Sequence, residues 1–250
     1  MNRLVLSKLL ALAVGLACVF FAFKYNKNAL YETSDSIYGT YWKLVSTEYI
    51  PDPLIQSIKQ ELNRIDFVAS NYKPSSELSI INASPINTEI GISSDMYTIL
   101  KFAEDLHQLS NGYYDVTIGS LIIKEGFGPE SSMVDNAIPV SEKRFNFSNN
   151  NSITKNDNFQ FDLSSIAKGY ALDSISNLLM KANRNNYLID IGGEIIVNGS
   201  KHGEPWTVGI QSPSAVNNQS DTQIRSNKFL AIATSGEYRN FKLNDNGVVT

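Results

Sequence analysis

Residues 161–199 constrain the fold of this chain more than any other segment. Asp162 and Ser164 are residue types found at helix starts, and apolar residues follow them at roughly helical spacing. A helix is therefore predicted to begin near Ser164, and a strand over 187–197 is predicted to follow it. Gly192-Gly193 interrupts that strand and allows another backbone or a ligand to approach closely.

The predicted helix start has two interpretations. Its first turn offers unpaired N–H groups and the positive end of the helix dipole, and Lys168 lies one turn further on. This combination suits a phosphate or another anion. The residues alone favour the plainer interpretation, in which a capped helix carries a solvated lysine and a bulged strand follows.

The rest of the chain mixes helix and strand patterns. Apolar spacing predicts helices over 54–68 and 96–109, the second opened by Ser93 or Ser94 and stopped by Asn111-Gly112. Strands are predicted over 38–45, 206–210 and 229–233, and 73–76 reads as a turn. This mixture indicates an α+β class with largely antiparallel sheets.

Composition narrows the function classes. The chain has 250 residues, of which 42% are hydrophobic, enough for a sizeable core as one domain or two packed lobes. Residues 1–27 carry four basic and no acidic side chains, so the remainder has 17 basic against 25 acidic side chains. An acidic surface argues against broad nucleic-acid binding.

Residues 1–27 are predicted to be a targeting segment in front of a domain over 28–250. The apolar run 9–23 is flanked by basic residues, and its length falls between a signal-peptide core and a short membrane span. Cys18 lies in a GLAC sequence similar to a bacterial lipoprotein cleavage site. Lipidation at Cys18, an uncleaved membrane anchor and ordinary signal cleavage remain open, and all three imply export to the bacterial cell envelope.

Tyr113, Tyr114 and Asp115 follow the predicted helix stop and form an aromatic and carboxylate group. The structural interpretation is a helix end leading into a strand over 116–122, with Asp115 capping a turn. His107 and His202 are predicted to be exposed, and no zinc-site pattern is present in the sequence. Ser235-Gly236, before Glu237, is interpreted as a tight turn.

Five ordered blocks resemble the ApbE family, the FAD:protein FMN transferases. They are IYGTYWKL at 37–44, NYKPSSELSIIN at 71–82, NGYYDVTIGSLIIKEGFGP at 111–129, the 161–199 segment, and AIATSGEYRNF at 231–241. The resemblance covers nearly everything after residue 36. It implies a T-fold-like architecture built from two related α/β halves.

The resemblance also implies a set of site residues. Those that would hold FAD are Tyr38, Tyr72, Tyr113, Tyr114, Asp115, Asp162 and Lys168. Ser165 would give one oxygen to a Mg²⁺ ion that bridges the diphosphate, an ion that prefers oxygen ligands. Tyr38 stands where many members have methionine, a departure that bears on how the flavin packs.

The implied reaction is Mg²⁺-dependent transfer of FMN from FAD to a threonine or serine hydroxyl of a client protein, with release of AMP. FAD is then a substrate, and the implied clients are membrane-bound redox subunits, such as those of sodium-translocating or Rnf-type complexes. Two alternatives are a non-catalytic FAD-binding or flavin-trafficking protein and a hydrolase that cleaves FAD to FMN and AMP.

The family pattern continues beyond the last block into a His-x-x-Asp-Pro-x-Thr-Gly segment and a region with further magnesium ligands. This sequence ends at Thr250. We therefore expect either an incomplete gene product or a natural truncation, a poor transferase in both cases, and rescue of activity when the family's C-terminal segment is restored.

Overall fold

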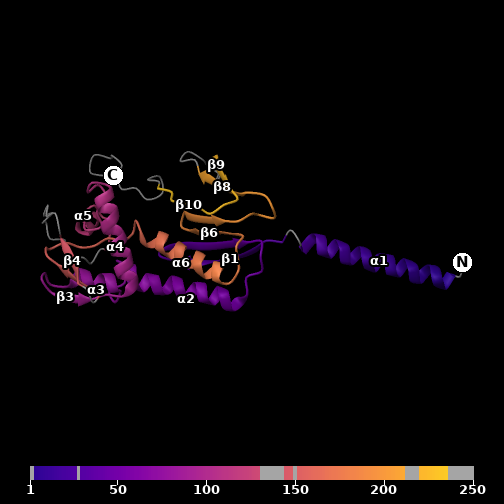
Figure 1. Cartoon of the computed structure of the whole chain (residues 1–250), viewed down its shortest axis with the longest axis horizontal. Coiled ribbons are helices and arrows are strands. Elements are labelled where there is room, and N and C mark those ends of the chain that lie inside the picture. The colour runs from indigo at the N-terminus through magenta and orange to yellow at the C-terminus, as the bar shows by residue number, and fades with distance from the viewer. Residues whose placement is uncertain (1–2, 27–28, 130–143, 149–150, 212–219, 236–250) are drawn as a thin grey trace. The chain divides into compact units, whose positions relative to one another are not determined.

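The computed structural model describes residues 3–26, 29–129, 144–148, 151–211 and 220–235 (Figure 1). The chain divides into two compact units. The first combines 1–35, 42–51 and 182–250, and the second combines 36–41 and 52–181. Segments of the two units alternate along the sequence, so neither unit is one continuous stretch of chain.

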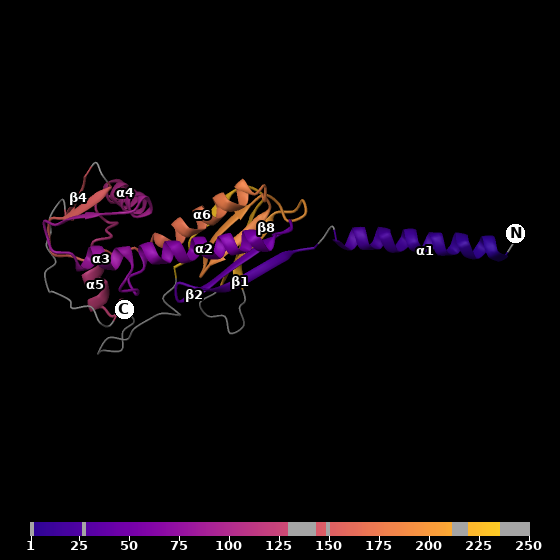
Figure 2. The ribbon, with the colours of Figure 1, turned by 90° about the horizontal axis from the view of Figure 1, so that it is seen from below.

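The first unit is built on a five-stranded sheet. Its strands are β1 (Tyr31–Ile37), β2 (Thr40–Ser46), β6 (Tyr187–Ile191), β7 (Glu194–Asn198) and β10 (Leu230–Ile232), in the order β1-β2-β6-β7-β10. Figure 2 shows β1 and β2 side by side. The pairs β2–β6, β6–β7 and β7–β10 are antiparallel. A separate antiparallel pair consists of β8 (Trp206–Gln211) and β9 (Ser220–Ser226).

Two predicted strands differ from the structure because each contains a tight turn. Tyr38 and Gly39 have φ values of 53° and 70° and form the two-residue turn between β1 and β2. Gly192 and Gly193, with φ values of 58° and 99°, reverse the chain between β6 and β7. Positive φ at both central residues is typical of hairpin turns that match the twist of a sheet. The glycine pair therefore separates two strands instead of interrupting one.

The core of the first unit is formed by side chains that alternate between buried and half-buried along β6. Tyr187, Ile189 and Ile191 of β6 are fully buried, while the residues between them are half-buried. A second group of buried side chains consists of Val45, Val197, Trp206 and Val208. Period-two burial is what a strand with one face on a core requires.

The second unit is mainly helical. Its helices are α2 (Asp52–Ala69), α3 (Glu77–Ala83), α4 (Ser94–Leu109), α5 (Gly119–Lys124) and α6 (Ala167–Lys181). Its small antiparallel sheet has the order β3 (Glu89–Gly91), β5 (Ser152–Lys155), β4 (Phe145–Ser148). The α+β class is confirmed, and so are α2 and α4, the latter capped by Ser93 Oγ, which accepts from the N–H of Met96 at 3.1 Å.

The strand predicted over 116–122 is wrong, because this segment forms α5. Ile118 and Gln160 make an isolated parallel bridge just before the helix begins. The N–H of Gly119 donates to the carbonyl of Gln160 at 2.9 Å, and a Cβ at Gly119 would lie 2.6 Å from that oxygen. The glycine thus lets the two backbones approach where the chain turns into the helix.

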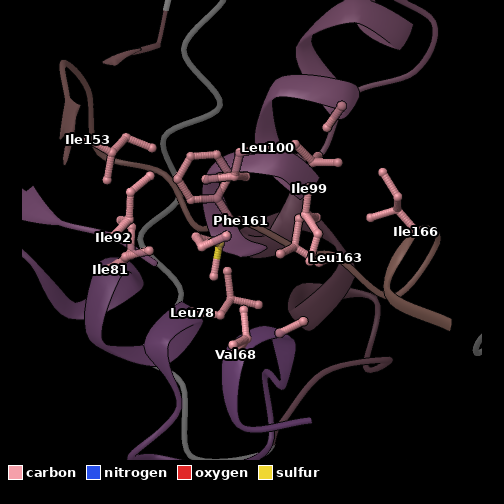
Figure 3. Packing of buried hydrophobic residues seen from close by; sticks show 14 of the residues in the cluster. Val68, Leu78, Ile81, Ile92, Ile99, Leu100, Ile153, Phe161, Leu163 and Ile166 are labelled. Carbon is pink, nitrogen blue, oxygen red and sulfur yellow. The ribbon is translucent and has the colours of Figure 1, made fainter. Parts of the chain in front are cut away.

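Phe161 lies in the hydrophobic core of the second unit. Figure 3 shows it among Leu78, Ile99, Leu100 and Leu163, each at most 1% exposed. Helices α3 and α4 supply three of these side chains, while Phe161 and Leu163 flank Asp162. This burial fixes the backbone on both sides of Asp162, so the core anchors a predicted site residue.

Residues 3–26 form one helix, α1 (Arg3–Asn26). Among the residues that the structure describes, no helix combines the length and the apolar character needed to cross a membrane. Gly236, Glu237 and the end of the last block lie outside the described residues.

Candidate functional site

Helix α6 begins at Ala167 instead of Ser164, because a turn precedes it. The N–H groups of Ile166 and Ala167 both donate to the carbonyl of Leu163, at 3.0 and 2.9 Å. The N–H of Ser164 donates to Asp162 Oδ1 at 2.8 Å. Three amides that the sequence offered to an anion are therefore already bonded within the chain, which leaves less of an anion site than predicted.

Asp162 is 7% exposed and held from several sides. Its Oδ1 accepts from Ser164, its Oδ2 accepts from Asn71 Nδ2 at 2.8 Å, and its own N–H donates to the carbonyl of Val116 at 2.8 Å. A carboxylate oxygen accepts more than one hydrogen bond. Asp162 is thus part of the local structure and still has acceptor capacity for a ligand.

A cavity of about 270 Å³ lies beside Asp162. Its lining comes from the loop after α2, from α3, α5 and the segment 160–162, and includes Asn71, Tyr72, Ser79, Asn82, Gly119, Gln160 and Asp162. Tyr72 is 66% exposed, and its hydroxyl donates to the carbonyl of Phe127 at 3.3 Å. Its ring is therefore tethered at one end while its face remains accessible to a planar group. Tyr72 lies on the loop between α2 and α3.

A second cavity, of about 460 Å³, is lined by residues of α4 and α6, by Ile166, and by two hydroxyl-bearing residues, Tyr114 after α4 and Ser165 before α6. The oxygens of these two hydroxyls lie 3.0 Å apart. Helix α4 contributes apolar side chains to the lining, including Phe102 and Leu106, whereas the residues from α6 are mostly polar. This cavity offers an apolar wall next to a pair of hydroxyl groups.

The loop that carries Tyr114 is fixed by α4. Ser110 Oγ accepts from the N–H of Tyr114 at 2.9 Å, and His107 Nδ1 lies 2.8 Å from the carbonyl oxygen of Tyr114. Because a carbonyl only accepts, His107 Nδ1 carries the proton in this contact. The sequence predicted His107 as a solvent-exposed residue, whereas it is half-buried and bonded to this loop.

Asp115 caps a turn, as the structural interpretation predicted. Its Oδ1 accepts from the N–H and the hydroxyl of Thr117, at 2.8 and 2.7 Å. Arg144 Nη1 also donates to the Thr117 hydroxyl, at 2.7 Å. Asp115 therefore holds the turn that precedes α5, and its implied contact with FAD remains a prediction.

The other implied FAD residues do not line these two cavities. Tyr113 is 95% exposed, and Lys168 is half-buried in the first turn of α6. The Tyr38 hydroxyl donates to the carbonyl of Leu62 at 2.9 Å, and burial raises the pKa of Tyr38 well above its usual range. The predicted residues are thus brought together as two pairs, Tyr72 with Asp162 and Tyr114 with Ser165.

The described residues do not fit a complete magnesium site. They contain no group of three or more histidine, cysteine, aspartate or glutamate residues able to hold a metal ion. Ser165 contributes one neutral oxygen, which is hydrogen-bonded to Tyr114. Mg²⁺ loses its water reluctantly and usually takes one or two carboxylates together with substrate phosphates.

Sequence reasoning missed Asn82, which lines the first cavity, and Lys155, which bonds to Asn82 from behind the lining. The Asn82 side chain accepts from the N–H of Phe161 at 2.7 Å and donates to its carbonyl at 2.9 Å. Lys155 is 2% exposed, donates to the backbone carbonyl of Asn82 at 2.8 Å, and has a pKa lowered by burial. Asn82 closes the block 71–82, but its bond to residue 161 depends on tertiary structure that no local pattern encodes.

Comparison with known proteins gives a consistent result. A model of the ApbE family matches residues 38–249. The FAD:protein FMN transferase of Vibrio cholerae is 32% identical over 213 residues, which are 78% of this chain and 63% of that protein. The enzyme of the same name from Haemophilus influenzae is 32% identical, over 74% of this chain and 58% of its own length. The chain therefore spans about three fifths of the length of these relatives.

Solved structures show the same likeness. The flavin transferase ApbE from Vibrio cholerae has a TM-score of 0.73 and 29% identity, over 86% of this chain and 74% of that one. The ApbE protein from Thermotoga maritima has a TM-score of 0.74 and 26% identity, over 88% of this chain and 74% of its own. The α+β fold is thus shared with these proteins.

Proposed function

Because this chain belongs to the ApbE family, we propose that it acts as an FAD:protein FMN transferase. The observation that carries the proposal is the family match over 38–249, joined to relatives that bear this enzyme name. The geometry of one cavity also supports the proposal. Tyr72 and Asp162, an aromatic ring and a carboxylate predicted to hold FAD, line a single cavity.

In the proposed reaction, a threonine or serine hydroxyl of a client protein attacks the phosphorus attached to riboflavin. A new oxygen–phosphorus ester bond forms, the bond between the two phosphates breaks, and AMP leaves. The hydroxyl proton passes to solvent or to the departing phosphate. The chemistry needs little beyond positioning and charge stabilisation.

The Tyr114 and Ser165 hydroxyls are suited to an anionic ligand. Their pair contains two hydroxyl protons, and the contact between the oxygens uses only one of them. The other proton is then available to donate to a diphosphate oxygen. We propose that Lys168, in the first turn of α6, adds positive charge near the same group.

Magnesium is part of the proposal, although the described residues do not make its site. Bound Mg²⁺ would neutralise diphosphate charge. We propose Ser165 as one of its ligands, together with oxygens of the diphosphate and water. No step above depends on the ion.

One experiment separates the proposed activity from its alternatives. The purified chain is incubated with FAD, Mg²⁺ and a peptide that contains the acceptor threonine, and the products are identified by mass spectrometry. Flavin on the peptide, and none on a matched peptide with alanine instead of threonine, supports the transferase. Free FMN and AMP with unlabelled peptide indicate a hydrolase, whereas bound but intact FAD indicates a flavin-binding protein. Either of these outcomes contradicts the proposal.

We also propose that residues 1–27 direct export, so that the rest of the chain acts outside the cytoplasm on membrane-bound redox clients. The support is the apolar run 9–23 between basic residues. Fusion of this segment to a reporter that is active only after export tests the proposal, and a cytoplasmic reporter refutes it. Replacing Cys18 with serine then separates lipidation, which requires the thiol, from a helical anchor, which does not.

A further inference from the structure

Asn71 has a side-chain oxygen without a hydrogen-bond partner in the described part of the chain. Its Nδ2 donates to Asp162 Oδ2 at 2.8 Å, whereas its Oδ1 is buried and unpaired. An ionised carboxylate only accepts hydrogen bonds, so the amide nitrogen must face Asp162. The orientation of the amide is therefore fixed by chemistry, and Oδ1 is turned away from Asp162.

Hydrogen bonds hold the loop that carries Asn71 in place, so a movement of the backbone does not bring a donor to Oδ1. The N–H of Tyr72 donates to Ser70 Oγ at 3.1 Å, and the N–H of Ser76 donates to the carbonyl of Lys73 at 2.9 Å. A buried acceptor without a donor destabilises a folded protein and calls for an explanation. One explanation is that a bound ligand supplies the missing hydrogen-bond donor.

Asn71 lines the cavity of about 270 Å³ together with Tyr72 and Asp162. This volume is several times the roughly 30 Å³ that one water molecule occupies. The χ2 torsion of asparagine has a broad energy well. Because Oδ1 is buried, a ligand in the cavity would reach it through a rotation about χ2 that keeps Nδ2 within hydrogen-bond distance of Asp162.

We infer that Asn71 accepts a hydrogen bond from an N–H group on one of the two heterocycles of FAD, and that it thereby helps to position FAD in this cavity. The inference rests on the proposed function, in which this cavity binds FAD. Two groups of FAD have the required donor, the imide N–H of the flavin ring and the amino group of adenine. The exposed Tyr72 ring at the same cavity provides the stacking partner that such a heterocycle needs.

Calorimetry with three ligands tests the inference. The wild-type chain is titrated with FAD, with FAD methylated at the flavin imide nitrogen, and with the analogue whose adenine is replaced by purine, which lacks only the amino group. We expect one analogue to bind about tenfold more weakly than FAD, the loss that accompanies removal of one hydrogen bond. The Asn71→Leu variant should bind that analogue and FAD equally. Asn63→Leu, which makes the same change on the exposed face of α2, should behave as wild type.

The outcomes are distinct. If wild type binds FAD and both analogues within about twofold of one another, the inference is overturned while the proposed function stands. If wild type does not bind FAD, the proposed function fails and the inference fails with it. The analogue titrations use the wild-type protein, so they decide the question even if Asn71→Leu does not fold, which thermal unfolding reveals.

Discussion

The hydroxyl oxygens of Tyr114 and Ser165 lie 3.0 Å apart, although 51 residues separate them in the chain. Tyr114 belongs to the loop after α4, and Ser165 precedes α6. The resemblance assigned the tyrosine to FAD and the serine to magnesium. Their contact means that a ligand at one hydroxyl also affects the other.

The first prediction concerns this pair. Tyr114→Phe removes the phenolic hydroxyl and should weaken FAD binding about tenfold, because the remaining serine loses its partner and the diphosphate loses a donor. Fluorescence quenching of FAD measures the effect. Tyr49→Phe is the matched control, because Tyr49 is 58% exposed, lines neither cavity and should leave FAD binding as in wild type. Equal losses in both variants would show that the hydroxyl pair has no special role.

The second prediction concerns Asp162. Asp162→Ala should lower the free energy of unfolding by about 1–3 kcal/mol, because it leaves the N–H of Ser164 and the amide of Asn71 without their acceptor. It should also weaken FAD binding. Urea unfolding measures the first effect and calorimetry the second. Ser164→Ala keeps the backbone N–H and should change stability by no more than about 0.5 kcal/mol. A fully stable Asp162→Ala protein would contradict the structural role.

The third prediction concerns acid stability. Arg64 donates to both oxygens of Glu61, at 2.7 and 2.9 Å, and to Asp95, which also accepts from the Tyr170 hydroxyl at 2.6 Å. The hydrogen bond from Arg64 is the largest cause that lowers the pKa of Glu61. For Asp95, burial opposes ionisation, but the bonds from Arg64 and Tyr170 outweigh it and the pKa is lowered.

Both carboxyl groups therefore have folded-state pKa values below their ordinary values of 4.5 and 3.8. Their contribution is complete above those values and disappears as the pH falls through the folded-state values. Arg64→Met should remove most of it, so that the variant and wild type differ at neutral pH and converge in acid. Urea unfolding across this range measures the difference. A difference that does not depend on pH would refute the electrostatic account.

The fourth prediction concerns Lys155, whose pKa is lowered by burial. Between its folded-state pKa and the ordinary value of 10.5, the unfolded chain binds more protons, so this lysine makes stability rise with pH. Lys155→Met should remove that rise. Unfolding measured at neutral and mildly alkaline pH tests it. The exposed Lys201 provides the control, since Lys201→Met should keep the slope of wild type.

Local patterns predicted the elements that depend on neighbours in sequence. The α4 helix, its Ser93 cap and its stop at Asn111-Gly112 follow from spacing and capping chemistry, and the structure confirms them. The segment 116–122 was misread because its β-branched residues favour a strand, while the glycine contact with Gln160 that precedes α5 is a tertiary feature.

In the candidate site, too, the sequence predicted some residues, whereas others become apparent only from tertiary contacts. The family blocks identified Tyr72 and Asp162, which the structure places at one cavity. They did not reveal that Asn71 and Asn82 support that cavity, because each bonds to a segment about 80 or more residues away. Pairings of this kind depend on the folded chain, and no single window of sequence contains them.

The Asn82 side chain accepts from the N–H of Phe161 and donates to its C=O. This pair of bonds to one residue resembles the backbone pairing between neighbouring strands. Few replacements preserve this. Aspartate has no donor for the carbonyl, serine is too short to reach both groups, and leucine offers neither. Position 82 should therefore tolerate few substitutions, and a change there would release the backbone next to Asp162, although the Asn82 side chain itself bonds only to backbone groups of Phe161 in the described structure.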